Sequence, residues 1–258
     1  MILTADYHTH TPYSHGKGTV LENATHAQEQ GLKEIGITDH GFSHIAFGLR
    51  RKKLPFLIEE CKKATQKTGV KVLVGMEANI LGESGKTDMQ PKDYEYFDLF
   101  LAGKHVFIAY ENLSAWTGYC ATNFFTDKLK LTPAPKLIER NTRAYINTIQ
   151  NNPVDVISHV NYLCFSNALE VAKCAADYGT YIEINTKKSH LSDQEWQDII
   201  DKTAVRFLIN SDAHSPARVG DCALADELFA RINFPKERID NIDGRTANFR
   251  FQAFKEKM

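Results

Sequence analysis

The sequence predicts an α/β protein, a TIM-like (β/α)7 barrel. Three observations lead to this fold. Apolar, strand-like segments alternate with helical segments about seven times, which is typical of a parallel sheet with right-handed crossovers. The length of 258 residues is close to that of a single barrel. Histidines recur where the predicted strands end.

The composition is that of an ordinary globular domain. Hydrophobic residues make up 43% of the chain and charged residues 24%, and the formal net charge is -1. We therefore expect no membrane association and no binding of long nucleic acid. Five cysteines without a CxxC pair predict reduced thiols. The N-terminus lacks a basic segment followed by a long apolar run, so we expect a cytoplasmic protein with one domain, residues 1–258.

The first predicted strand, preceded by Ile2 and Leu3, leads into the stretch DYHTHTPYSHG at residues 6–16. Strand side chains alternate between two faces, so His8 and His10 share a face at the end of this strand, and His15 follows in the loop. Neutral imidazole is the commonest transition-metal ligand. A strand with one exposed and one hydrogen-bonded histidine would give the same pattern, so this motif alone leaves metal binding open.

The other elements alternate in order along the chain. Apolar runs, glycine stops and capping residues set their limits. The further predicted strands are residues 34–40, 71–78, 99–105, 154–159, 181–185 and 206–211. The predicted helices are residues 21–30, 54–68, 135–150, 167–178, 193–203 and the tail from residue 220.

Two segments interrupt this alternation. Residues 80–89 contain Gly82 and Gly85 and are expected to form a small hairpin or loop excursion. Residues 106–132 lack a clear period but hold six aromatic side chains. A segment of this length is commonly a lid or binding loop. Its aromatic residues would either cover a substrate or anchor the excursion, and the sequence does not choose between these.

Potential metal ligands stand at or just past the ends of these strands. They are His8, His10, His15, His40, Glu77, His105, His159, Asp212 and His214. A parallel barrel gathers its C-terminal strand ends in one mouth, so these residues are expected to meet there. The chain has ten histidines and seven belong to this set, which scattered core or surface histidines would not do. His44, in the loop after the second strand, is a further histidine close enough in sequence to approach the site.

Nine nitrogen and oxygen donors exceed what a single tetrahedral site uses, so we predict a cluster of metal ions. Glu77 and Asp212 are the carboxylates able to bridge two ions, because each has two oxygens.

This pattern resembles the PHP (polymerase and histidinol phosphatase) family of metal-dependent phosphoesterases. The resemblance spans nearly the whole chain. The matching segments are HTHTPYSHG at 8–16, ITDHG at 37–41, GMEANI at 75–80, AGKH at 102–105, ISH at 157–159, EIN at 183–185 and SDAHSPARVG at 211–220. One departure is Val160 and Asn161 after the strand-five histidine, where many members have proline. We expect this departure to reshape the substrate side more than the metal site.

The resemblance implies a distorted TIM-like (β/α)7 barrel with a metal site at the C-terminal ends of its strands. It implies that this site holds three divalent transition metal ions, which are zinc, manganese or iron. It implies one ion on His8, His10, Glu77 and Asp212. It implies a second on Glu77, His105 and His159, and a third on His15, His40 and His214.

The expected activity is hydrolysis of a small phosphomonoester by a metal-bound hydroxide, as in a histidinol phosphatase of histidine biosynthesis. We assign catalytic roles to Asp212, His214 and Arg218. Arg218 is also the expected phosphate clamp, because guanidinium matches phosphate bidentately; the alternative is that it caps the last helix. Lys187 and His190, in the loop after the sixth strand, are predicted substrate contacts. The sequence identifies neither a general acid nor an oligomeric state.

Three alternative functions are compatible with part of the same pattern. A phosphodiesterase or nuclease acting on nucleotides is the main alternative, although the near-neutral charge argues against long nucleic acid. A metal-stabilised regulatory scaffold would be expected to have lost ligands, and all nine positions are filled. An amidohydrolase also carries HxH in a barrel, but we identify no lysine at the end of strand four as its usual bridging ligand.

Overall fold

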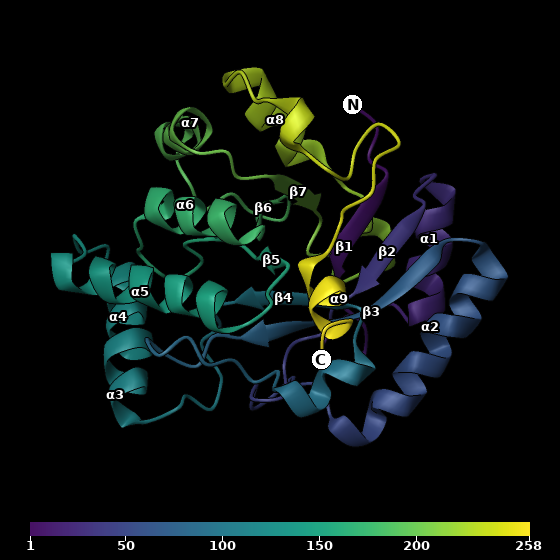
Figure 1. Cartoon of the computed structure of the whole chain (residues 1–258), viewed down its shortest axis with the longest axis horizontal. Helices are drawn as coiled ribbons and strands as arrows, with labels where there is room; N and C mark the ends of the chain where they lie inside the picture. The colour runs from purple at the N-terminus through teal and green to yellow at the C-terminus, as the bar shows by residue number, and fades with distance from the viewer.

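The structure, a computed structural model, describes the whole chain, residues 1–258, and confirms the barrel (Figure 1). Seven parallel strands are hydrogen-bonded in chain order, and the backbone pairing of Thr9 with Ala213 joins the first strand to the last. The strands are β1 (Ala5–Thr9), β2 (Glu34–Ile37), β3 (Lys71–Asn79), β4 (Leu99–Gly103), β5 (Val156–Ile157), β6 (Tyr181–Asn185) and β7 (Phe207–Asn210).

Most crossover helices lie where the sequence predicts them, outside the ring of strands. Each strand except β3 is followed by at least one α-helix, as the barrel requires. The helices are α1 (Val20–Glu29), α2 (Leu54–Thr68), α3 (Leu113–Ala115), α4 (Thr122–Lys128), α5 (Pro135–Asn151), α6 (Ala168–Tyr178), α7 (Asp193–Lys202), α8 (Ala223–Arg231) and α9 (Arg250–Lys255). None of them combines the length and the apolar character needed to cross a bilayer.

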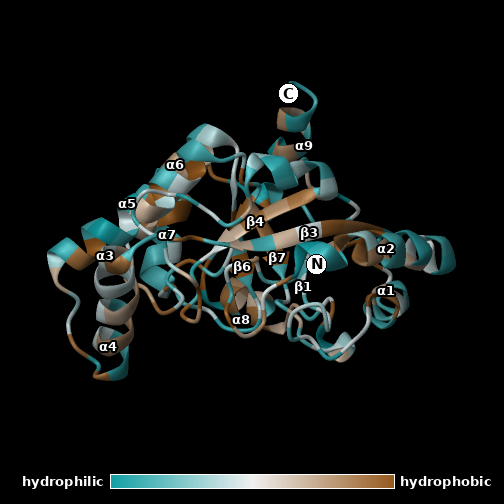
Figure 2. Cartoon of the chain, turned by 90° about the horizontal axis from the view of Figure 1, so that it is seen from below, coloured by the Kyte–Doolittle hydropathy of each residue, from teal (hydrophilic) through white to brown (hydrophobic).

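The core has two layers, one inside the barrel and one between strands and helices. The inner layer is a cluster of buried apolar side chains: Ala5, Tyr7, Leu73, Leu99, Leu101, Val156, Tyr181, Leu208 and Phe249. A larger cluster of 52 buried residues packs the helices against the outside of the strands. Figure 2 shows the same division, with apolar strands in the centre and polar outer helix surfaces. The inner layer fills the lower part of the barrel, so the polar residues gather at the C-terminal mouth.

The two interruptions take different forms. Residues 80–89 form the expected hairpin, since Ile80 and Thr87 pair as an antiparallel bridge. Residues 106–132 are largely helical, with α3, a π-helical segment (Trp116–Ala121) and α4 running in succession. This arm projects from the side of the barrel (Figures 1 and 2). Its helices are short, half of their residues are exposed, and the buried positions include the polar Asn123 and Thr126. They therefore lack the periodic apolar stripe that would have predicted them.

The tail closes the N-terminal end of the barrel but is helical only in part. Residues 232–249 run between α8 and α9 mostly as extended chain and turns, with a single 3₁₀ turn at Lys236–Arg238, so the expectation of a helical tail is wrong for most of them. Phe249 joins the inner layer, and α9 lies over the centre of the barrel in Figure 1. The Asp155 carboxylate accepts hydrogen bonds from Phe100 N at 2.9 Å and Phe251 N at 2.8 Å, and so ties α9 to β4.

Asp155 makes stability depend on pH. Burial raises its pKa from 3.8 to about 7, and the backbone donors offset this only in part. Between these two pH values the folded protein keeps a proton that the unfolded chain releases, so the stabilisation is present at low pH and is lost as pH rises. We expect the free energy of unfolding, relative to Asp155→Asn, to fall across this window by about 1.4 kcal/mol per pH unit at most.

Urea unfolding at a series of pH values measures this difference. The exposed Asp177→Asn, in α6, is the control, and its stability should run parallel to that of the unaltered protein. Parallel curves for Asp155→Asn as well would contradict the burial argument.

Candidate metal centre

The Glu77 carboxylate lies at the centre of the barrel mouth, surrounded by imidazoles. It is fully buried near the end of β3, where its strand register places it beside Leu101 of β4. Its Oε1 lies 2.6 Å from Nε2 of His159. Its Oε2 lies 2.9 Å from Nδ1 of His40 and 3.3 Å from Nε2 of both His8 and His105. Side chains from the ends of four other strands therefore meet around this one carboxylate.

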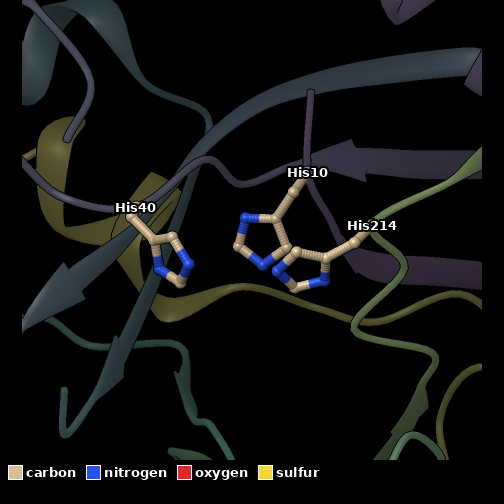
Figure 3. Close-up of side chains that lie close together, drawn as sticks. All are labelled: His10, His40 and His214. Atoms are coloured by element: carbon tan, nitrogen blue, oxygen red, sulfur yellow. The ribbon is translucent and has the colours of Figure 1, made fainter. Parts of the chain in front are cut away.

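The remaining predicted ligands lie beside this group. Asp212 Oδ1 is 3.4 Å from His10 Nε2 and 3.9 Å from His8 Nε2. Figure 3 shows the imidazoles of His10, His40 and His214 gathered together. His15 lies next to them, with its ring centroid 4.3 Å from that of His214 and 4.8 Å from that of His40.

Four overlapping groups of three ligand atoms lie close enough to share an ion. They are His8, His10 and Asp212; His8, Glu77 and His159; His40, Glu77 and His105; and His10, His40 and His214. The first and last groups match parts of two of the three expected ligand sets. His15 belongs to none of the four, although its ring adjoins the last one.

Many ligand atoms of this cluster lack a hydrogen-bond partner within the protein. Buried atoms without a hydrogen bond include Glu77 Oε2, His8 Nε2, His40 Nδ1, and both ring nitrogens of His10 and His105. An unpaired buried polar atom is costly, so a cluster of them is stable only if something else satisfies it. Burial also lowers the pKa of His10 and His40, which favours neutral, ligand-competent imidazole. The chemistry of these nitrogen and oxygen donors fits divalent transition metals.

Local backbone irregularities aim the ligands inward. The register of β1 against β2 shifts between Asp6 and Thr9, and this bulge lets Tyr7 and His8 both face the barrel interior. His159 and Asp212 have positive φ values of 29° and 48°, conformations that non-glycine residues rarely adopt. Such strain concentrates at functional sites, because the surrounding structure must hold it in place.

Gly103 at the end of β4 lets the centre close. A Cβ there would lie 2.3 Å from Ser158 Oγ and 3.0 Å from Glu77 Oε1. Ser158 Oγ donates to Glu77 Oε1 at 2.9 Å, so a larger residue at position 103 would displace this pair.

Three buried aspartates hold the loops that carry the histidines. Asp39 accepts hydrogen bonds from the backbone N–H and the hydroxyl of Thr11, between His10 and His15. Asp88 accepts hydrogen bonds from the backbone N–H and the hydroxyl of Ser43, and from the backbone N–H and the side-chain amide of Asn79. Asp6 accepts from the N–H groups of Ser211 and Gly220, on either side of His214.

Glu183 of β6 is a buried carboxylate that the sequence analysis did not assign to the site. Its Oε1 lies 2.7 Å from His8 Nδ1 and accepts from Asn210 Nδ2 at 3.0 Å. Its Oε2 accepts from His159 N at 2.7 Å and from Asn185 Nδ2 at 2.9 Å. It thus turns His8 Nε2 toward Glu77. The signal was present in the EIN segment, since Glu183 stands near a strand end like the ligands themselves.

A cavity of about 400 Å³ opens over the cluster. Lys187, His190 and His44 are among the residues that line it. The first two are the residues predicted as substrate contacts, and that role stays a prediction. Lys187 Nζ lies 3.3 Å from Asp212 Oδ1 and 3.2 Å from His214 Nδ1. His44 accepts a hydrogen bond on Nδ1 from Phe47 N, so when neutral it carries its proton on Nε2.

Arg218 does not lie where its predicted role requires. It is not among the residues that line the cavity. It belongs to a 3₁₀ turn (Pro216–Arg218), and its guanidinium donates to the Thr186 carbonyl and pairs with Asp221 at 3.0 Å. That turn directs the side chain along the surface, and Lys187 is the cation beside the cluster.

Lys104 stands directly after β4, so the expectation that strand four has no lysine at its end is wrong. Its side chain is buried, but Nζ donates to the Leu163 carbonyl at 2.7 Å and lies 5.4 Å from the centre of the Tyr119 ring. Because the Leu163 carbonyl engages its ammonium group, Lys104 does not take the bridging position of an amidohydrolase lysine.

Comparison with known proteins agrees with this architecture. The family model for the PHP domain matches residues 6–187. The chain belongs to the PHP family. It is 33% identical over 253 residues to a probable phosphatase of Caldanaerobacter subterraneus, covering 93% of this chain and 87% of that one. It is 31% identical to a probable phosphatase of Clostridium novyi, covering 92% and 90% of the two chains.

The solved structure of a histidinol phosphate phosphatase has the same fold. The structure of histidinol phosphate phosphatase from Lactococcus lactis, complexed with zinc, L-histidinol and phosphate, superposes with a TM-score of 0.59. The match covers 95% of this chain and 98% of that one at 16% identity, so it supports the fold and not a shared substrate.

Lys104→Met tests whether this lysine contributes to the centre. Because Nζ points to Leu163, we expect the variant to bind as much metal as the unaltered protein. Removing a buried ammonium group also removes its desolvation cost, so the free energy of unfolding should change by no more than about 1 kcal/mol. Metal analysis after reconstitution and urea unfolding measure both quantities, with exposed Lys67→Met in α2 as the control. Loss of metal in Lys104→Met alone would favour the amidohydrolase arrangement.

Proposed function

We propose that this protein is a metal-dependent phosphatase that hydrolyses a small phosphomonoester at the mouth of its barrel. The observation that carries the proposal is the buried Glu77 carboxylate with five imidazole nitrogens within 4 Å of its oxygens. The donors around it are mostly unpaired. A protein core gains nothing from such an arrangement unless cations complete it.

The proposed ligands are the nine predicted from the sequence, and the proposed ions number three. One ion would be held by His8, His10, Glu77 and Asp212. The second would be held by Glu77, His105 and His159, and the third by His15, His40 and His214. Divalent ions held there would supply a water nucleophile that is active at neutral pH and would neutralise charge on phosphoryl oxygens. Zinc, manganese and iron all fit donors of this type.

The protein's own groups bind and orient the phosphate. We assign Lys187 as the cation that contacts it, because its ammonium borders both the cavity and Asp212. An ammonium group is a compact point charge with three donors, and it can move between Asp212 and a phosphate oxygen without a change of fold. Arg218 keeps a lesser role, since its guanidinium already has two partners.

Glu183 positions the site without contacting the substrate. It holds the proton of His8 on Nδ1, which leaves the Nε2 lone pair facing Glu77. Carboxylate partners of this kind fix the ring orientation of metal-ligating histidines. The same carboxylate holds the backbone of His159, so one group orients ligands from two strands.

The size of the cavity favours a small substrate. About 400 Å³ is at the lower end of the range typical of small-molecule sites, and its floor is the ligand cluster. The phosphatase names of the two relatives and the phosphate bound in the Lactococcus lactis protein support the same reaction class.

Glu77→Gln tests the proposed function directly. The amide has one acceptor and brings two N–H donors among imidazole nitrogens, so we expect bound metal to fall by at least one ion per chain. Phosphate release from an aryl phosphomonoester should fall with it by about a hundredfold or more. Metal analysis and a phosphate assay on manganese-loaded protein measure the two effects, and exposed Glu227→Gln in α8 is the matched control.

Two results would count against the proposal. Unchanged metal content in Glu77→Gln would remove the metal centre as assigned. Hydrolysis of an aryl phosphodiester, with none of the monoester, would replace a phosphomonoesterase by a phosphodiesterase.

Glu183→Gln tests the positioning role separately. Its two oxygens face four donors, so an amide NH₂ must oppose at least one of them. We expect metal affinity, measured by competition with a chelator, to fall about 10- to 100-fold while the fold is retained. Affinity equal to that of Glu227→Gln would show that Glu183 serves only the packing of β6.

A further inference from the structure

The walls of the cavity differ in character from its floor. The floor is formed by metal-ligand candidates, whereas one wall is aromatic and another carries two lysines. The aromatic side chains are Phe47, Phe107, Phe124 and Tyr162, and the lysines are Lys187 and Lys188. Three of the aromatic residues are unusually exposed for phenylalanine, with 45% of Phe47, 67% of Phe107 and 37% of Phe124 accessible. None of these three side chains belongs to the buried apolar core.

Exposed apolar side chains gathered at a cavity indicate a binding surface, because isolated domains rarely leave such groups in water. These aromatic side chains come from three separate segments, which are the loop after β2, the arm of residues 106–132 and the loop after β5. Tyr162 of this last loop has its ring centroid 5.1 Å from those of both His159 and His190. Its neighbours Asn161 and Leu163 have φ values of 68° and 44°, so the chain turns tightly to place it there.

The same cavity holds almost no negative charge. Asp212 is the single carboxylate among its lining residues. Its Oδ1 lies within 3.4 Å of both His10 Nε2 and Lys187 Nζ, so it is already engaged with the centre. Within this cavity a substrate that carries an ammonium group would find no free carboxylate to pair with. Asp127 and Glu195 line the adjoining pocket, but Asp127 faces Lys130 at 3.8 Å and Glu195 accepts hydrogen bonds at the N-terminus of α7. The ammonium group would instead lie close to the exposed side chain of Lys188.

From these observations, and resting on the proposed phosphatase function, we infer that the substrate is the phosphate ester of an apolar, ring-bearing alcohol that carries no ammonium group. The phosphate binds at the floor beside Lys187, and the leaving group packs against the aromatic wall. The Lys188 side chain lies beside the leaving group, and its positive charge is compatible with a neutral or acidic leaving group. An amino alcohol phosphate of the histidinol type is disfavoured here by like-charge repulsion in a partly enclosed site.

Two esters that differ by one group provide the test. They are the phosphates of 3-phenylpropan-1-ol and of 2-amino-3-phenylpropan-1-ol, which share a carbon skeleton. With metal-loaded protein we expect kcat/KM for the amino ester to be lower by about tenfold or more. A second pair, histidinol phosphate and its analogue without the amino group, should give the same order. Equal or faster turnover of the amino esters would overturn the inference and leave the phosphatase function standing.

Charge reversal at Lys188 separates electrostatics from shape. Lys188→Glu should raise kcat/KM for the amino ester relative to the amino-free ester by about tenfold, and Lys188→Gln should fall between. Lys67→Glu, far along α2 and exposed, is the control and should leave the ratio unchanged. An unchanged ratio in Lys188→Glu would overturn the assignment of this lysine to the leaving-group site.

The aromatic wall has its own readout. Phe124→Ala should raise KM for phenylpropyl phosphate by about fivefold or more, with kcat and the KM for methyl phosphate little changed. An equal rise in KM for both esters would mean that the wall does not contact the leaving group. Binding of the matched phosphonates, which cannot be hydrolysed, is measured in parallel by calorimetry. Discrimination in binding without turnover of any ester would keep the ligand preference and refute the proposed function.

Discussion

The burial of one carboxylate organises this molecule. Glu77 is fully buried, and although burial alone would raise its pKa, His105 and His8 hold that pKa well below its ordinary value. An ionised carboxylate in such a place requires positive charge, and five imidazoles supply only part of it because several of them are kept neutral. The barrel therefore builds an anionic, nitrogen-rich centre that is complete only with bound cations.

The neighbouring irregularities follow from that constraint. The bulge in β1 and the positive φ of His159 bring imidazole nitrogens close to Glu77. The absence of a side chain at Gly103 leaves room for Ser158 Oγ beside Glu77 Oε1. Each costs stability where it occurs. Buried aspartates then fix the adjoining loops by accepting several backbone and hydroxyl hydrogen bonds, which offsets the cost with local rigidity.

The sequence predicts the parts of this arrangement that depend on periodicity and strand polarity. Seven strands and the convergence of nine ligand-type residues follow from alternation and from the shared direction of parallel strands. Other features depend on geometry that no pattern encodes. Arg218 follows His214 closely in sequence, yet a 3₁₀ turn separates it from the cavity, whereas Lys187 reaches the cluster from another strand. Lys104 stands at a ligand-bearing strand end but points toward Leu163, because consecutive residues face opposite sides.

Chemistry and substrate choice are carried by different parts of the chain. The floor of the cavity is set by strand ends, where a shift of one residue would turn a ligand away from Glu77. The walls come from loops and from the 106–132 arm. The arm contributes Phe107 from its opening loop and Phe124 from α4, and neither side chain belongs to the barrel core. A change in a wall residue alters contacts with the leaving group and leaves the buried carboxylate and its imidazoles in place. Members of this fold can therefore share a metal centre and still differ in the alcohol they release, so specificity has to be inferred from the walls of each cavity.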